Sequence, residues 1–156
     1  MSNILKEKKQ LPDIMITSPA IRALTTALIF ARNFKYPVKN MIVEESIYHA
    51  GNADDYINVL QKVDNVYKSA MLFGHNPTIT AACNHLNTFF IDHLPTTGVA
   101  CIDFKISHLP LEVVGSNIDF YDDANSAMTA FDNISGLSPT IIRIYTTTFQ
   151  DFNGKK

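Results

Sequence analysis

The sequence predicts an α/β protein with three layers, in which a mostly parallel sheet carries helices on both faces. Two short apolar runs, residues 13–18 and 70–73, each lead directly into a turn suited to a helix start. A continuous apolar run is typical of a strand that is covered on both faces. Because both strands feed helices in the same way, we expect both helices to begin at one edge of the sheet.

The first of these helices is predicted to begin at Ser18-Pro19, where serine caps and proline takes the first helical position. Its expected buried face recurs at steps of three and four residues and consists of Ala20, Ala23, Leu24, Ala27, Leu28 and Ala31. The helix is expected to end near Tyr36-Pro37.

A short strand at residues 41–43 and a helix capped by Asn52 come next. The buried side of that helix is expected to carry Tyr56, Ile57, Leu60 and Val63. After the strand at 70–73, Asn76 is the expected cap and Pro77 the first helical residue. The spacing of the residues that follow predicts a buried face of Ile79, Ala82, Leu86 and Phe89.

The last third of the chain predicts further strands. Residues 98–106 read as one strand, and residues 111–114 and 118–121 flank Gly115-Ser-Asn117, a three-residue turn suited to an antiparallel hairpin. Residues 122–138 look irregular or weakly helical. Residues 140–149 have the β-branched and aromatic content of one more strand.

Length and composition predict one folded domain. The chain has 156 residues, 46% hydrophobic and 18% charged, with a formal net charge of -2. The basic residues form no large cluster, so no nucleic-acid partner is expected. No apolar run approaches the roughly 20 residues of a membrane helix, and no signal peptide is evident, so no membrane partner and a cytoplasmic location are expected. Cys83 and Cys101 are expected to be reduced core residues.

Arg22 and His75 are the candidate functional residues. Each lies at one of the two strand-to-helix junctions, where helix N-termini favour anions. A guanidinium suits phosphate oxygens, and a protonated imidazole could donate to the same anion. Chemistry alone leaves open that both are ordinary surface or structural residues. No metal site is expected, because the spacings of the cysteines and histidines match no zinc pattern.

Four segments together resemble one known family. The run Ser18-Pro-Ala-Ile-Arg-Ala-Leu-Thr-Thr-Ala27 is similar to the second signature of histidine phosphatases, and Gly74-His-Asn-Pro77 is similar to the third. The segments at residues 44–55 and 94–98 are similar to the corresponding parts of SixA-type members. From about Leu11 to Tyr121 the chain resembles a SixA-type phosphohistidine phosphatase, which implies a phosphoglycerate mutase-like fold.

The resemblance implies roles for individual residues. Arg22 and His75 would be the catalytic phosphate clamp, and Ser18, Asn76, Thr97 and Gly98 would line the phosphate pocket. The implied substrate is a phosphohistidine-bearing protein or a small phosphate ester, and no cofactor is implied. The chain would then divide into a phosphatase-like domain at residues 1–121 and a divergent extension at residues 122–156, which is expected to add one strand.

One departure from the family is large. The family's nucleophile belongs to an Arg-His motif at the end of a first strand, and no Arg-His pair occurs in this sequence. Residues 3–10 resemble only the end of the helix that follows this motif, so the first strand is expected to be missing. Among the other histidines, His49 is the one expected near the pocket, and a solvated loop position is its favoured interpretation. The strand at 140–149 is a candidate to fill the vacated position.

Three interpretations therefore stay open. The chain is a shortened form of an ordinary phosphohistidine phosphatase, or a pseudoenzyme that binds phosphohistidine or another phosphate group without hydrolysing it. The third interpretation is a fragment that oligomerises through unpaired sheet edges.

Overall fold

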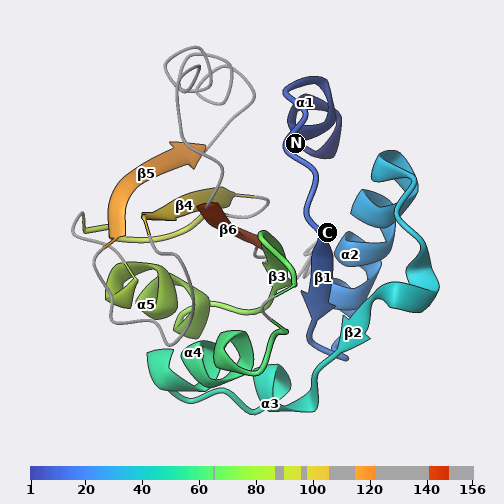
Figure 1. Cartoon of the computed structure of the whole chain (residues 1–156). Coiled ribbons are helices and arrows are strands. Elements are labelled where there is room, and N and C mark those ends of the chain that lie inside the picture. The colour runs from blue at the N-terminus through green and yellow to red at the C-terminus, as the bar shows by residue number, and fades with distance from the viewer. Residues whose placement is uncertain (65, 87–89, 96–97, 106–114, 122–140, 148–156) are drawn as a thin grey trace, which may run out of the picture.

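A computed structural model describes residues 1–64, 66–86, 90–95, 98–105, 115–121 and 141–147, and from residue 103 onward it describes the backbone alone. The described strands form one six-stranded sheet in the order β2-β1-β3-β6-β4-β5 (Figure 1). They are β1 (Ile14–Thr17), β2 (Ile42–Val43), β3 (Ala70–Phe73), β4 (Val99–Lys105), β5 (Gly115–Tyr121) and β6 (Ile141–Thr147). Strands β2, β1, β3 and β6 run parallel, whereas β4 is antiparallel to both β6 and β5. The chain is therefore an α/β protein with a mixed sheet.

Helices cover both faces of this sheet. They are α1 (Ser2–Glu7), α2 (Ile21–Phe34), α3 (Glu45–Tyr48), α4 (Ala53–Gln61) and α5 (Thr78–His85), with a 3₁₀ turn η1 (Val38–Asn40). Ile14 and Ile16 of β1 pack against α3, α4 and α5 in one core cluster. Met15, between them in sequence, packs with α1 and α2 in a second cluster on the opposite face. This alternation gives the three layers that the sequence predicts.

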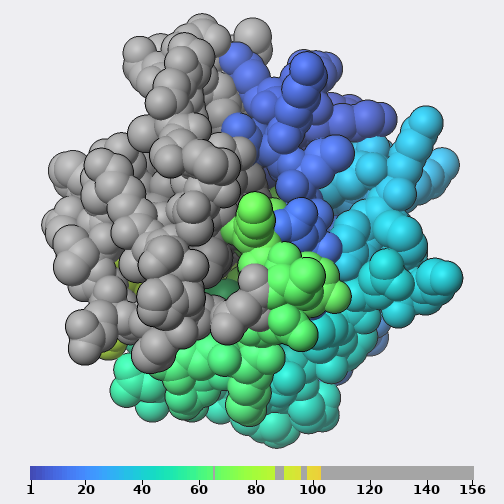
Figure 2. Space-filling model, viewed as in Figure 1, coloured from blue at the N-terminus to red at the C-terminus, as the bar shows by residue number. Residues whose placement is uncertain are grey.

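The N-terminal half of the chain forms the right-hand and lower parts of the face that Figure 2 shows. Figure 2 shows the blue to green atoms of this half as one continuous surface.

The described residues include no helix that is long and apolar enough to cross a membrane. Cys83 and Cys101 are buried and unbridged, as the sequence predicts.

The carboxyl ends of β1 and β3 lie side by side. All four residues of each strand are buried, and Thr17 pairs with Phe73 in parallel register. One residue further along, the Ser18 N–H donates a hydrogen bond of 3.0 Å to the Phe73 carbonyl. Because the two strands end together, the loops that follow them start from neighbouring points at one edge of the sheet.

Helix α2 begins later than the sequence predicts. The face that it buries is also rotated about the helix axis relative to the predicted face. Ala20, not Ser18, stands before the first helical turn. Ala23, Ala27 and Ala31 are buried as expected, but Leu28 is 39% exposed. Aromatic side chains take the place expected for leucine: Phe30 packs edge-on against Phe73 with ring centroids 5.4 Å apart. The prediction for Leu28 was wrong because two phenylalanines, Phe30 and Phe34, fill more of the core than a leucine can.

The two later helices agree more closely with the sequence. Asn52 caps α4 as predicted, in a reciprocal capping box with Asp55. Ile79, Ala82 and Leu86 are buried around α5. However, α5 starts at Thr78 with Pro77 as its cap, so Asn76 is not the capping residue. The expected position of Phe89 lies outside the described residues.

The antiparallel pair near the C-terminus differs from the predicted one. Gly115 to Asn117 lie inside β5 and pair with β4, so the turn predicted at Gly115-Ser-Asn117 is wrong. The β-branched segment at the end of the chain does form a strand, β6, which lies between β3 and β4. Residues 122–138 lie outside the described part, and the division of the chain at residue 121 stays a prediction.

Candidate functional site

Ser18, Arg22 and His75 meet at the edge where β1 and β3 end. The Arg22 Nε donates to His75 Nδ1 at 3.3 Å, although the two residues are 53 positions apart in sequence. The other ring nitrogen, His75 Nε2, lies 2.8 Å from Ser18 Oγ. Ser18 Oγ also accepts a 3.3 Å hydrogen bond from the Ala20 N–H at the entry to α2. Two residues that the sequence singles out separately therefore form one cluster with a third.

His75 is held in one neutral tautomer. A nitrogen that accepts from Arg22 Nε cannot itself carry a proton, so Nδ1 is bare and the ring proton belongs on Nε2, facing Ser18. Burial, followed by the nearby positive charge of Arg22, lowers the pKa of His75 below its usual value. In the absence of a ligand the imidazole of His75 is therefore neutral, whereas the sequence suggests a protonated donor. A bound anion would favour the protonated form.

Ser18 is fully buried, with an exposed fraction of 0%. Its hydroxyl is engaged by the His75 ring and by the Ala20 N–H, not turned toward solvent. Ser18 therefore orients the imidazole in this structure, and its contact with phosphate stays a prediction.

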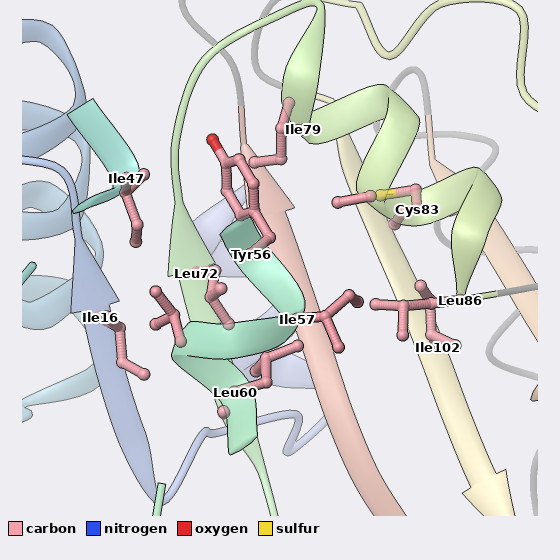
Figure 3. Close-up of a cluster of buried hydrophobic side chains, with 14 of the residues drawn as sticks. Ile16, Ile47, Tyr56, Ile57, Leu60, Leu72, Ile79, Cys83, Leu86 and Ile102 are labelled. Atoms are coloured by element: carbon pink, nitrogen blue, oxygen red, sulfur yellow. The ribbon is translucent and has the colours of Figure 1, made fainter. Parts of the chain in front are cut away.

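The Tyr56 hydroxyl contacts the backbone of His75. The hydroxyl oxygen accepts a 3.0 Å hydrogen bond from the His75 N–H. Figure 3 shows the Tyr56 ring in the core cluster, with its hydroxyl oxygen pointing away from Ile57 and Leu60. Burial raises the pKa of Tyr56 to about 12, so the hydroxyl stays protonated. The sequence places Tyr56 on a buried helix face but gives no signal for this polar contact.

Gly74 makes the approach of Tyr56 possible. A Cβ atom at this position would lie 2.0 Å from the Tyr56 hydroxyl oxygen, which no side chain can tolerate. The glycine before His75 therefore has a steric reason that is independent of its resemblance to a family motif.

Asn76 holds a neighbouring loop through its side-chain amide, and its contact with phosphate stays a prediction. Its Nδ2 donates 2.7 Å to the Leu94 carbonyl, and its Oδ1 accepts 2.6 Å from Thr80 Oγ1. Thr80 Oγ1 in turn accepts from the Leu94 N–H at 3.1 Å. Gly98 is buried and donates its N–H to the Pro95 carbonyl at 2.8 Å. Thr97 lies outside the described residues.

An open pocket of about 710 Å³ lies beside the cluster. Its lining combines the start of α2 with α3 and consists of Pro19, Ala20, Ile21, Arg22, Glu45 and Tyr48. The Tyr48 ring stands edge-on to the His75 ring, with centroids 6.4 Å apart. The sequence identified Arg22 as a site residue, whereas the position of Glu45 and Tyr48 at the same pocket follows from the packing of α3 beside the start of α2.

The start of α2 is suited to an anion. No described side chain caps this helix, and its first turn contains no acidic residue. The backbone N–H groups of a first helical turn carry partial positive charge, which adds to the full charge of Arg22. Among the described residues, no group of three or more histidine, cysteine, aspartate or glutamate side chains could hold a metal ion.

Two other residues near the pocket have structural explanations. Glu44 accepts from the Ser46 N–H at 3.2 Å and from Ser46 Oγ at 2.6 Å, and so caps α3. The hydrogen bonds from Ser46 lower the pKa of Glu44, which keeps it an ionised cap. His49 is exposed and packs edge-on against Tyr48, with ring centroids 5.0 Å apart.

Comparison of the chain with protein-family models, curated proteins and solved structures finds no match.

Proposed function

We propose that this chain is a histidine-phosphatase-like domain of the SixA type that binds the phosphoryl group of a phosphohistidine-bearing protein at Arg22 and His75. The observation that carries the proposal is the 3.3 Å contact between Arg22 Nε and His75 Nδ1 beside the N-terminus of α2. The two motifs that suggest phosphate chemistry thereby share one site. A phosphoglycerate mutase-like arrangement of the sheet belongs to the same proposal, and the interior position of β6 supports it.

The proposed site attracts a phosphoryl group through three kinds of positive charge. Arg22 is exposed at the pocket and supplies a planar fork of N–H donors. The first turn of α2 supplies backbone N–H groups at the positive end of the helix dipole. A bound anion would also favour protonation of His75 at Nδ1, which replaces the hydrogen bond from Arg22 Nε and supplies a second cation. Each contribution is specific for negative charge and none requires a metal.

Binding is favoured over hydrolysis for this chain. Both ring nitrogens of His75 are engaged, one by Arg22 and one by Ser18, so the imidazole has no lone pair aimed into the pocket. The sequence contains no histidine after His108, so β6, which ends beside β3, carries none. The nucleophile of the family therefore has no counterpart at either position. A phosphohistidine protein as partner and a cytoplasmic location stay predictions.

The proposal is tested by measuring the binding of a phosphohistidine peptide to the full chain by calorimetry. Arg22→Ala is expected to weaken binding about tenfold or more, because hydrogen bonds to charged groups are lost. Arg32→Ala is the matched control, since Arg32 is exposed in the last turn of the same helix and leaves the pocket intact. Equal binding by the two variants would refute the site.

Phosphate release is followed in the same samples. No turnover is expected from the wild-type chain. Turnover that His75→Ala abolishes would show that the chain is a phosphatase and that binding alone is the wrong function.

A further inference from the structure

The pocket beside Arg22 is also lined by residues that the proposed phosphoryl clamp, Arg22 and His75, does not include. Ile21 is 84% exposed and Tyr48 is 56% exposed, so two large apolar side chains border the pocket from α2 and from α3. Exposing apolar surface in this way is unfavourable unless something covers it. Glu45 adds a carboxylate to the same lining.

Tyr48 is held in place before any ligand arrives. The short helix α3 is capped by Glu44 and anchored by Ile47, which is buried in the core. The Tyr48 ring stands edge-on to the His75 ring at 88° and edge-on to the His49 ring at 89°. Edge-on packing against two rings fixes the orientation of the Tyr48 ring, so it presents a prepared surface for another ring.

The pocket carries one charge of each sign, on two different helices, and this combination suits one class of ligand. Arg22 lies at the start of α2 and Glu45 at the start of α3. A phosphorylated imidazole carries a negative phosphoryl group on one ring nitrogen and can carry an N–H donor on the other. A phosphorylated serine has the phosphoryl group but neither a ring nor a second donor.

Building on the proposed phosphoryl binding at Arg22 and His75, we propose that Tyr48 and Glu45 form a subsite for the imidazole ring of the phosphohistidine. The ring packs against Tyr48 and Ile21, and its second nitrogen, which carries an N–H when the ring is protonated, donates to the Glu45 carboxylate. This subsite makes the protein selective for a phosphoryl group carried on an aromatic nitrogen over one carried on an aliphatic oxygen.

The test compares three probes on the full chain by calorimetry: inorganic phosphate, histidine phosphorylated on one ring nitrogen with both ends capped, and capped phosphoserine. The wild type is expected to bind the phosphohistidine probe about tenfold more tightly than the phosphoserine probe. Tyr48→Ala and Glu45→Gln are each expected to reduce this ratio about three- to tenfold, as aromatic contacts and charge-assisted hydrogen bonds are lost.

Inorganic phosphate serves as the internal control. Its affinity is expected to change less than that of the phosphohistidine probe in both variants, because inorganic phosphate has no ring to contact Tyr48 or Glu45. Circular dichroism shows that the variants are folded. Tyr67→Ala removes another exposed tyrosine that does not line the pocket, and it is expected to leave all three affinities unchanged.

The two proposals fail in different ways. If phosphate binding depends on Arg22 but the wild type does not distinguish the two phosphoamino acids, the imidazole subsite is wrong and the phosphoryl clamp stands. The same conclusion follows if Tyr48→Ala leaves the ratio unchanged. If the wild type binds none of the three probes, both proposals are wrong.

Discussion

Gly74 shows how one missing side chain positions the site. A Cβ atom there would lie 2.0 Å from the Tyr56 hydroxyl oxygen and 2.8 Å from two ring carbons of Tyr56. We therefore expect Gly74→Ala to displace the tyrosine, to break its hydrogen bond to the His75 N–H and to lower the free energy of unfolding by about 1–3 kcal/mol. Urea denaturation measures this change.

Gly51→Ala is the matched control for that variant. Nothing lies within 4 Å of a Cβ atom at Gly51, so this substitution is expected to change the free energy of unfolding very little. Equal effects of the two substitutions would mean that the close approach of Tyr56 to Gly74 does not exist in solution.

His75 should report the arrival of an anion through its own titration. Without ligand, burial and Arg22 keep the pKa of His75 below about 6.5, the value of a free histidine. Sulfate, which stays a dianion across this range, is expected to raise that pKa. Binding of sulfate should consequently tighten as the pH falls through the pKa of His75. Histidine NMR titrations with and without sulfate measure the shift.

Arg22→Ala is the informative comparison for this titration. Removing the neighbouring cation should raise the pKa of His75 in the free protein, and weaker sulfate binding should shrink the further rise on adding the anion. A pKa of His75 that sulfate does not move in the wild type would contradict anion binding at this residue.

The residues of the site differ in how well the sequence predicts them. Arg22 and His75 stand directly after strand-to-helix turns, and such junctions can be recognised from apolar runs and helix-start residues. Tyr48, Tyr56 and the orienting role of Ser18 could not be predicted in this way. Each depends on a partner from another element, such as the Tyr56 hydroxyl that meets a backbone N–H 19 residues away.

Among the elements, α2 offers the clearest test of the packing. Phe30 is 6% exposed and contacts Phe73, whereas Leu28 is exposed on the opposite side of the same helix. Phe30→Ala is expected to lower the free energy of unfolding by about 3–5 kcal/mol, and Leu28→Ala by much less. Thermal or urea denaturation distinguishes the two, and a larger loss for Leu28→Ala would mean that the helix is rotated toward the face that its sequence suggests.

Periodicity predicted the existence of α2 but not its rotation. Alanine and leucine at steps of three and four residues form one stripe, and Phe30 with Phe34 shifts the true buried face to one side of it. The start of the helix was misplaced for a similar reason: Ser18 has the ideal side chain for a cap, but its hydroxyl lies against His75. Long-range contacts of this kind override local preferences.

At the scale of the whole molecule, β6 links the two parts of the sheet. It pairs with β3 on one side and with β4 on the other, so it is an interior strand of the sheet. Deleting residues 140–156 is expected to expose two unpaired strands and to abolish cooperative unfolding, with aggregation as the visible result. Deleting only residues 150–156, which leaves β6 in place, is the control. A monomeric, cooperative protein without β6 would show that the strand is dispensable.

The amino-acid composition of residues 140–149 predicted the strand β6, since isoleucine, threonine and tyrosine dominate this segment. Its place in the sheet was suggested by the need to fill an unpaired interior position, not by any local pattern. The nearby antiparallel pair was predicted less well. A glycine-containing turn signal at residues 115–117 lies within β5 because pairing with β4 extends through it.

The central claim is that Arg22 and His75 together bind a phosphoryl group. The most direct test titrates inorganic phosphate into the full chain, while NMR follows the arginine Nε–H and histidine ring signals. The account predicts saturable shifts of the Arg22 and His75 signals at one common affinity, with little change at Arg32, His85 and His93. Shifts that spread evenly over all arginines and histidines without saturating, or the absence of any shift, would contradict it.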